Sequence, residues 1–124
     1  MYITLVKSKL HQARVTDANL NYVGSITIDQ DLMDAVGMYP YEKVLVVDIE
    51  NGQRFETYTL IGQRGSGTIQ LNGAAARLVS IGDRIIVMAF AQMAPPPPDD
   101  YAPTVVILDE HNRIAQRLTG RPTQ

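Results

Sequence analysis

The sequence predicts a mainly β protein whose strands close, or nearly close, into a barrel. Three observations support this fold class: apolar segments are short and rich in β-branched residues, turn residues separate them, and only two segments have the signals of short helices. A chain of 124 residues is long enough for one hydrophobic core and short for two. We therefore expect a single domain over residues 1–124.

Two short strands and a helix are expected first. Residues 2–6 are apolar and β-branched, and residues 25–28 alternate polar with apolar side chains, so both segments predict strands. Asp29 is a suitable N-cap for a helix, and Gly37 followed by Pro40 indicates where that helix ends. The apolar face of this helix is expected to hold Leu32, Met33 and Val36.

A β-hairpin is the strongest short-range signal in the chain. Asn51-Gly52 separates an apolar run at residues 43–49 from a second strand at residues 53–60, and Asn-Gly favours a tight hairpin turn. The unbroken apolar run is typical of a strand buried on both faces. Side chains alternate along the second strand, so they should separate into two sets. One face is expected to carry Arg54, Glu56 and Tyr58, and the other Phe55, Thr57 and Thr59.

Three further strands are expected in the second half of the chain. The segment Asn72–Ala76 predicts a short helix, because Asn72 is a suitable cap and the alanines are good helix formers. Gly82 and Asp83 then form a turn. The strands are expected at residues 68–71, 84–91 and 104–108.

Two later segments are not expected in the sheet. The prolines at residues 95–98 predict a stiff connector with polyproline geometry, because proline has no N–H group to donate within a central strand. Residues 113–124 lose hydrophobic periodicity and predict a loose tail.

The composition excludes several classes of function. A net charge of −2 and a pI near 5.6 give no positive field for a phosphate backbone, so nucleic acid is not expected as a partner. Without cysteine there are no disulfides or thiolate metal sites, and His11 and His111 are too far apart in sequence to indicate a zinc site. No apolar run is long enough for a signal peptide or a membrane helix. We expect no metal, no membrane association and a cytoplasmic location.

Single residues carry little functional information in this chain. Gly-Ser occurs at Gly24-Ser25 and again at Gly65-Ser66, and such dipeptides are ordinary turn residues. His11 taken alone is better interpreted as a hydrogen-bonding residue than as a catalyst. The combination of motifs, rather than any one of them, indicates a function.

Several motifs between Lys9 and Val87 stand in a specific order and at specific separations. They are Lys9-Leu10-His11, Val15–Ser25, Ile28-Asp29, Asn51–Arg54, Thr57-Tyr58, Arg64–Ser66, Asn72–Ala76 and Gly82-Asp83. Together they resemble the family of pyruvoyl-dependent aspartate 1-decarboxylases. Several independent motifs in register are a specific signal, whereas the proline run and the polar tail lie outside the resemblance.

The resemblance implies a function, a cofactor and an assembly. The function is decarboxylation of L-aspartate to β-alanine and CO₂, the first committed step toward pantothenate. The cofactor is a pyruvoyl group that the chain makes from Ser25 by cutting itself after Gly24, so neither a metal nor pyridoxal phosphate is needed. The cut would leave residues 1–24 as the β chain and residues 25–124 as the α chain. The implied fold is the double-psi β-barrel with two or three short helices, in a homotetramer with sites between subunits.

The resemblance also assigns roles to residues. Ser25 is the pyruvoyl precursor and the point of Schiff-base attachment, Gly24 supplies the attacked carbonyl, and Tyr58 is the proton donor. Glycine leaves that carbonyl accessible and permits strained backbone angles. The planar guanidinium of Arg54 suits a carboxylate of aspartate, and Lys9 is a point-charge partner. The implied substrate-binding residues are Lys9, Arg54, Thr57, Asn72, Gly73, Ala74 and Ala75, with His11 and Tyr22 in support.

Thr57 conflicts with the alternation of side chains along its strand. The resemblance assigns it the oxyanion that forms when Ser25 attacks, yet alternation puts it on the face opposite Tyr58. Either the backbone bulges there, or Thr57 contacts the site from another side, for example in a neighbouring subunit. The sequence leaves both explanations open.

Two other functions agree with parts of the sequence. One is a non-catalytic double-psi barrel that serves as an interaction module, although a scaffold needs none of the chemistry listed above. The other is a pyruvoyl decarboxylase for another amino acid such as glutamate, since one methylene group is a small difference for a binding site. The sequence also leaves open the rate of self-cleavage, the need for an accessory maturation factor, and the carboxylate that Arg54 binds.

Overall fold

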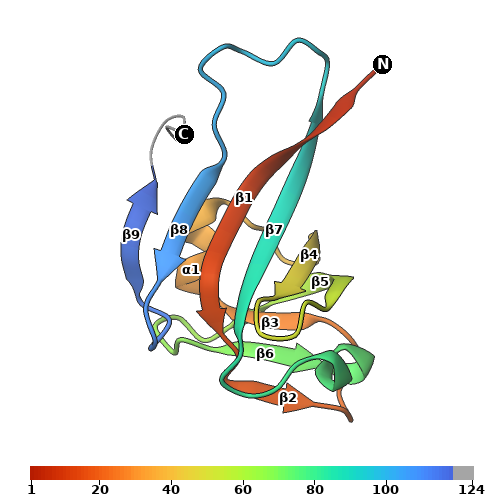
Figure 1. Cartoon of the computed structure of the whole chain (residues 1–124), viewed down its shortest axis with the longest axis vertical. Coiled ribbons are helices and arrows are strands. Elements are labelled where there is room, and N and C mark those ends of the chain that lie inside the picture. Colours follow the sequence, from red (N-terminus) through yellow and green to blue (C-terminus); the bar gives the residue numbers. More distant parts are fainter. Residues whose placement is uncertain (119–124) are drawn as a thin grey trace.

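The computed structural model describes residues 1–118, which form nine strands and two short helices (Figure 1). This confirms the mainly β class and both expected helices. The helices are α1 (Gln30–Val36) and the 3₁₀ helix η1 (Gly73–Leu78). The strands are β1 (Ile3–Arg14), β2 (Asp17–Asn19), β3 (Ile26–Asp29), β4 (Lys43–Asp48), β5 (Arg54–Gly62), β6 (Ile69–Asn72), β7 (Arg84–Met93), β8 (Thr104–Leu108) and β9 (Ile114–Leu118).

All of these strands belong to one sheet with the order β2-β6-β3-β5-β4-β7-β1-β8-β9. Three pairs are parallel, namely β1 with β8, β2 with β6, and β3 with β5. The sheet curls so that its two ends meet: the N–H of Thr16 donates to the carbonyl of Ile69 (2.8 Å), and the Asn112 amide donates to the carbonyls of Arg14 and Gly67. The nearly closed barrel agrees with the double-psi β-barrel that the resemblance implies.

Helix α1 has the boundaries that its local sequence predicts. The Asp29 carboxylate accepts a hydrogen bond from the N–H of Asp31 (2.9 Å), and Gly37 ends the helix in the left-handed conformation at φ 74°. Its apolar face is buried against β1, β3 and β8. Asp29 is itself buried and also accepts from the N–H groups of Gly65 and Gly67. One carboxylate therefore ties the start of α1 to the turn before β6.

The Asn51-Gly52 hairpin is confirmed, and it joins β4 to β5 in continuous antiparallel register from Lys43↔Tyr58 to Val47↔Arg54. Asp48, the last residue of β4, is fully buried, and its Oδ1 accepts hydrogen bonds from two N–H groups of the turn. Among residues 1–118 no N–H group donates to its Oδ2, which lies beside the Asp83 carboxyl, and the two acids can share a hydrogen bond only when one of them carries a proton. Burial, followed by this hydrogen bond, raises the pKa of Asp48 to about 6.

The expected burial of β4 on both faces is wrong. Only alternate side chains of the strand are buried in the core, and the side chains between them are half-buried because the outer face of β4 lines a groove. The buried set is Val44, Val46 and Asp48, and the half-buried set is Leu45 and Val47.

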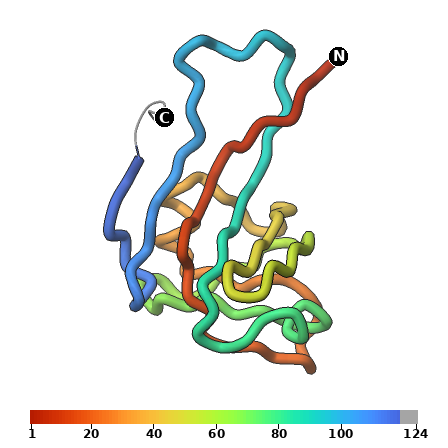
Figure 2. The backbone as a smooth tube through the Cα atoms, viewed as in Figure 1, coloured from red at the N-terminus to blue at the C-terminus, as the bar shows by residue number. Residues whose placement is uncertain are grey.

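The first strand is much longer than the expected segment at residues 2–6. It runs to Arg14 because it pairs with β7 along nearly its whole length, from Ile3↔Met93 to Arg14↔Arg84. Figure 2 shows the start of β1 and the end of β7 extending together away from the rest of the fold. The connector that follows β7 contains the proline run, in which the bond between Pro95 and Pro96 is cis.

The expected loose tail at residues 113–124 is wrong for its first part. Residues 114–118 form β9, which pairs with the exposed edge of β8 from Leu108↔Ile114 to Val105↔Leu118. Residues 119–124 lie outside the described part of the chain.

Candidate active site

Ser25 lies immediately before β3 in a strained and fully buried position. Its relative exposure is 0% and its φ is +103°, a region that residues with a side chain rarely occupy. We expected the strained angle at Gly24, but the φ of Gly24 lies outside the positive region. The strain is therefore on the serine side of the Gly24–Ser25 bond.

Asn72 contacts Ser25 through both its backbone and its side chain. Its N–H donates to the carbonyl of Ser25 (2.9 Å), and its Nδ2 donates to Oγ of Ser25 (3.0 Å). The side chain makes no capping hydrogen bond to η1, so the expected capping role is wrong although Asn72 does precede the helix. The amide lies beside Ser25 because β6 pairs with β3, and Ile26 faces Leu71 across that pair.

Gly73 packs directly on the backbone of the residue before Ser25. Its φ is +66°, and a β-carbon at this position would lie 2.8 Å from the nitrogen of Gly24 and 3.0 Å from the carbonyl oxygen of Tyr22. Only glycine fits such a contact, since backbone atoms on both sides cannot rotate away. Gly73 thus brings the 3₁₀ turn against the backbone of Gly24, while Ala74 is exposed and Ala75 packs against the core.

Tyr58 approaches the same bond from β5. A β-carbon placed on Gly24 would lie 3.9 Å from both Cε1 and Oη of Tyr58. Tyr58 directly precedes Thr59, and Thr59 pairs with Ile26, the residue after Ser25. Tyr58 and Asn72 therefore both lie close to the Gly24–Ser25 bond within one chain.

The structure also bears on the Thr57 conflict. The register of β5 is continuous from Arg54 to Tyr58, so the bulge explanation is wrong. Thr57 is two residues before Thr59, with which β5 begins its pairing to β3 at Ile26. The explanation that remains is that Thr57 contacts the site from another side than Tyr58.

Lys9 and Arg54 are not brought to Ser25 within one chain. Lys9 on β1 pairs with Met88 on β7, and Met88 pairs with Leu45 on β4. Leu45 in turn pairs with Glu56 on β5. Lys9 is therefore three strand spacings, or about 14 Å, from β5. Arg54 is four residues before Tyr58 on β5, which is about 13 Å along the strand. Both residues lie on the outer face of the sheet, as does Tyr58.

His11 is on the same outer face of β1 and has an unusual environment. Its Nδ1 is buried without a hydrogen-bond partner among residues 1–118. Burial lowers the pKa of His11 first of all, and the charges of Lys9 and Arg84 lower it further. The imidazole is therefore neutral at neutral pH.

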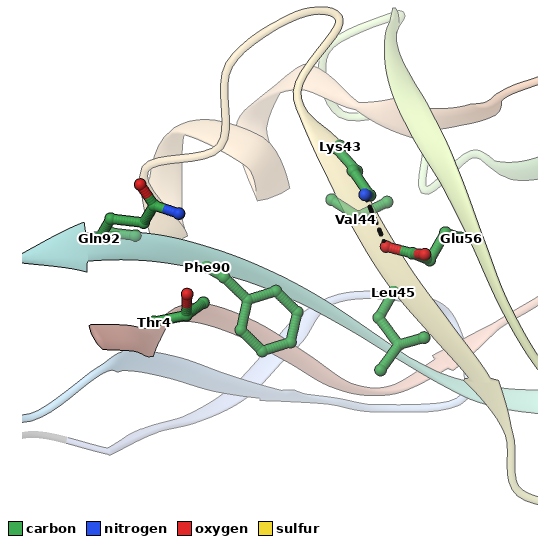
Figure 3. A pocket seen from close by; sticks show the side chains of 8 residues that line it. Thr4, Lys43, Val44, Leu45, Glu56, Phe90 and Gln92 are labelled. Carbon is green, nitrogen blue, oxygen red and sulfur yellow. Dashed lines mark ion pairs between the residues drawn. The ribbon is translucent and has the colours of Figure 1, made fainter. Parts of the chain in front are cut away.

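A groove crosses this outer face between the β1 and β7 pair and the β4 and β5 hairpin (Figure 3). Its volume is about 360 Å³, and an adjoining cavity reaches Arg54. Lys43 and Glu56 form an exposed ion pair of 2.9 Å at one side, and Phe90 and Leu45 face the space between the strands. The groove is mixed in character, with apolar walls and charged side chains at its edge.

Two side chains that the sequence analysis did not single out contact Asn72. Thr27 Oγ1 accepts a second hydrogen bond from Asn72 Nδ2 (3.1 Å), and Gln70 Nε2 donates to Asn72 Oδ1 (2.8 Å). Each lies two residues from a predicted site residue, Thr27 after Ser25 and Gln70 before Asn72. The alternation of side chains along strands could have identified them.

No group of acidic or histidine side chains among residues 1–118 is arranged to hold a metal ion. In the same part of the chain, no helix has the length and apolar character that crossing a membrane requires.

Comparison with known proteins identifies relatives along almost the whole chain. The family model "Aspartate decarboxylase" matches residues 1–115. The chain is 57% identical to "Aspartate 1-decarboxylase" of Carboxydothermus hydrogenoformans, over 94% of this chain and 91% of that protein. It is 61% identical to the protein of the same name from Chloroherpeton thalassium, over 91% and 83%. With the Bacillus subtilis protein of that name it shares 53% identity over 100% of this chain and 98% of the relative.

A solved structure, the "computationally designed msDPBB_sym2 protein", covers 70% of this chain and 99% of its own at 15% identity. Its TM-score of 0.44 is too low to support an argument about topology. The family match and the relatives do not depend on it. This chain belongs to the aspartate decarboxylase family.

Proposed function

We propose that this protein cuts itself between Gly24 and Ser25 and then decarboxylates L-aspartate to β-alanine and CO₂ in the cytoplasm. The observation that carries the proposal is the state of Ser25, which is buried at a φ of +103° with its Oγ held by Asn72. A buried, strained serine after glycine has no evident role in stability. The family membership and the names of the relatives support the substrate.

The proposed cut is an internal rearrangement. Ser25 Oγ attacks the carbonyl carbon of Gly24, and the acyl group moves from nitrogen to oxygen to give an ester. Loss of the Ser25 α-proton then breaks the Cβ–Oγ bond and releases a carboxylate on Gly24. Water replaces the freed nitrogen as ammonia and leaves a pyruvoyl group at residue 25, so the balance requires no oxidant.

The residues around Ser25 fit such a group. Residue 25 is fully buried, and the N–H of Asn72 donates to its carbonyl oxygen (2.9 Å), which a pyruvoyl group at this position would retain. A pyruvoyl group supplies an electron sink for the carbanion that forms when the α-carboxylate leaves. Tyr58 has its hydroxyl beside Gly24 and can return a proton to the α-carbon. The role that the resemblance implies for Thr57 is to donate to the oxyanion of the first attack, and Thr57 directly precedes Tyr58 on β5.

Charge recognition of aspartate requires residues that are far from Ser25 in one chain. Arg54 is about 13 Å along β5 from Tyr58, and Lys9 is about 14 Å across the sheet. Both are on the outer face with His11, on strands that line or adjoin the groove of Figure 3. We propose that Arg54 and Lys9 act on the aspartate bound at a neighbouring subunit, in a homotetramer with sites between subunits.

The experiment is to measure CO₂ release from carboxyl-labelled L-aspartate and L-glutamate by the purified protein and by Ser25→Ala. We expect release from aspartate by the parent chain, little from glutamate, and none from the variant. Treatment with an alkoxyamine, which captures ketones, should abolish activity of the parent chain. Turnover of aspartate by Ser25→Ala would contradict the proposal, and a preference for glutamate would change the substrate while leaving the chemistry intact.

A further inference from the structure

Asn72 is the centre of a short hydrogen-bonded chain of side chains. Its Nδ2 donates to Oγ of Ser25 (3.0 Å) and to Oγ1 of Thr27 (3.1 Å), while its Oδ1 accepts from Nε2 of Gln70 (2.8 Å). Asn72 is fully buried, and Thr27 and Gln70 are partly buried. Both hydrogens of the Asn72 amide and at least one lone pair of its oxygen are therefore used within the protein.

The two ends of an asparagine amide have the same shape but opposite hydrogen-bonding character. Neither hydroxyl neighbour decides which end faces Ser25, because a serine or threonine hydroxyl can donate or accept. In the structure the Nε2 group of Gln70 donates to Oδ1 of Asn72 (2.8 Å), and in this orientation the pair holds the oxygen of Asn72 on the Gln70 side. Gln70 thereby turns the Nδ2 group of Asn72 toward Ser25.

The orientation matters for the chemistry of the cut. When the ester breaks, the Cβ–Oγ bond cleaves and negative charge develops on Oγ as it leaves within the new carboxylate of Gly24. A donor that already contacts Oγ stabilises this charge, whereas a carbonyl oxygen in the same place would repel it. The Asn72 donor is useful only with its nitrogen toward Ser25.

We propose that Gln70 is a positioning residue for self-cleavage, and that it acts by holding the Asn72 amide with Nδ2 toward the Ser25 oxygen, while Thr27 anchors the same amide without setting its orientation. The proposal rests on the proposed function, since it concerns the rate at which the Gly24–Ser25 bond is cut. It assigns no contact between Gln70 and the substrate.

The decisive variants are Gln70→Glu and Gln70→Leu. The glutamate has the size and shape of glutamine, but as a carboxylate it only accepts, so it draws Nδ2 of Asn72 toward itself and turns the Asn72 oxygen to Ser25. The leucine removes the donor without imposing the reversed orientation. We expect cutting to slow about tenfold in Gln70→Leu and more in Gln70→Glu. A purely structural role predicts the opposite order, since glutamate preserves shape and polarity better than leucine.

The measurement is a time course of intact mass on freshly purified full-length precursor, with hydroxylamine added to samples at each time. Hydroxylamine cleaves an ester at residue 25 and leaves an amino-terminal serine, so it reports the intermediate separately from the finished product. We expect the ester to accumulate in Gln70→Glu, because the slowed step is the one that breaks it. Thermal unfolding of each precursor, made uncut with Ser25→Ala, checks that the variants fold.

Thr27 provides a second, milder test. Thr27→Val removes one acceptor of the Asn72 amide and should slow cutting about threefold, and Thr27→Ser should restore the parent rate. Equal cutting rates for the parent chain, Gln70→Glu and Gln70→Leu would overturn the proposal, as would a slower rate in Gln70→Leu than in Gln70→Glu. If the parent chain itself is never cut, the proposed function fails instead.

Discussion

Gly73 offers a direct test of how closely the 3₁₀ turn and the Gly24–Ser25 bond depend on each other. In Gly73→Ala, the added β-carbon would lie 2.8 Å from the nitrogen of Gly24. The backbone of residue 73 fixes the β-carbon, and the nitrogen is itself a backbone atom, so no side-chain rotation can relieve the contact. Because such atoms do not approach within about 3.0 Å, Gly24 or the turn has to move. A left-handed alanine adds about 1–2 kcal/mol to this cost. We expect a total loss of about 2–4 kcal/mol in the free energy of unfolding.

Gly52→Ala is the matched control for this variant. Gly52 has a φ of +76°, close to the +66° of Gly73, but a β-carbon there would have no neighbour within 4 Å. The control should therefore lose only the conformational term of about 1–2 kcal/mol and should cut itself at the parent rate. Thermal unfolding of both variants in a Ser25→Ala background measures stability without interference from the cut.

The rate of self-cleavage distinguishes the displacement of Gly24 from a general loss of stability. In chains that retain Ser25, Gly73→Ala should slow the appearance of the two fragments because Gly24 is displaced from its position beside Ser25. Stability and cutting rate equal to those of Gly52→Ala would refute the close contact between Gly73 and Gly24, and with it the proposed arrangement of the site.

Three further predictions concern Asp48, Tyr58 and Arg54. The raised pKa of Asp48, about 6 against 3.8 in an unfolded chain, means that its contribution to stability is fully present below pH 3.8 and lost as pH rises through 6. Asp48→Asn keeps a neutral amide at every pH, so its melting temperature should exceed the parent's above pH 7 and converge with it near pH 4; a constant difference across this range would contradict the shared proton. Tyr58→Phe should still produce both fragments but release CO₂ about 10²–10⁴ times more slowly, measured as kcat with aspartate, and an unchanged kcat would exclude Tyr58 as the proton donor. Arg54→Gln should cut normally, since Arg54 is about 13 Å along β5 from Tyr58, and should raise the KM for aspartate at least about tenfold; normal KM would remove Arg54 from the substrate site.

Local signals predicted the elements that local chemistry determines. Asp29 and Gly37 bound α1 through hydrogen bonds within a few residues, and Asn51-Gly52 needs only its own backbone conformation to turn the chain. These features are visible in a single sequence because the residues that cause them are adjacent. The alternation along β5 also held, since β4 and β5 pair in continuous register.

Long-range pairing explains the elements that were missed. β1 continues through the polar residues Lys7 and Lys9 because β7 pairs with it, and β9 forms in a stretch without periodicity because β8 offers an open edge. Asn72 has the sequence position of a cap, but the packing of β6 beside β3 gives its side chain a better partner in Ser25. Nothing in the local sequence reveals which strand lies beside which.

The candidate site, like the fold, could be predicted from the sequence only in part. The resemblance named Gly24, Ser25, Tyr58 and Asn72, and the structure brings these residues together in one chain. Spacing could not show that Lys9 is separated from them, because that separation depends on the strand order β5-β4-β7-β1, whereas the separation of Arg54 follows from its place four residues before Tyr58 on β5. Nor could it show that the strained angle belongs to Ser25, since φ is a property of the folded backbone.

The central claim is that Ser25 is consumed to make the catalytic group, and intact mass under denaturing conditions tests it most directly. Freshly expressed protein should convert from one chain into fragments of residues 1–24 and 25–124, with the larger fragment lighter by one ammonia than the product of simple hydrolysis. Ser25→Ala should remain whole. A parent chain that stays uncut after prolonged incubation, or a larger fragment that retains an amino-terminal serine, would contradict the account.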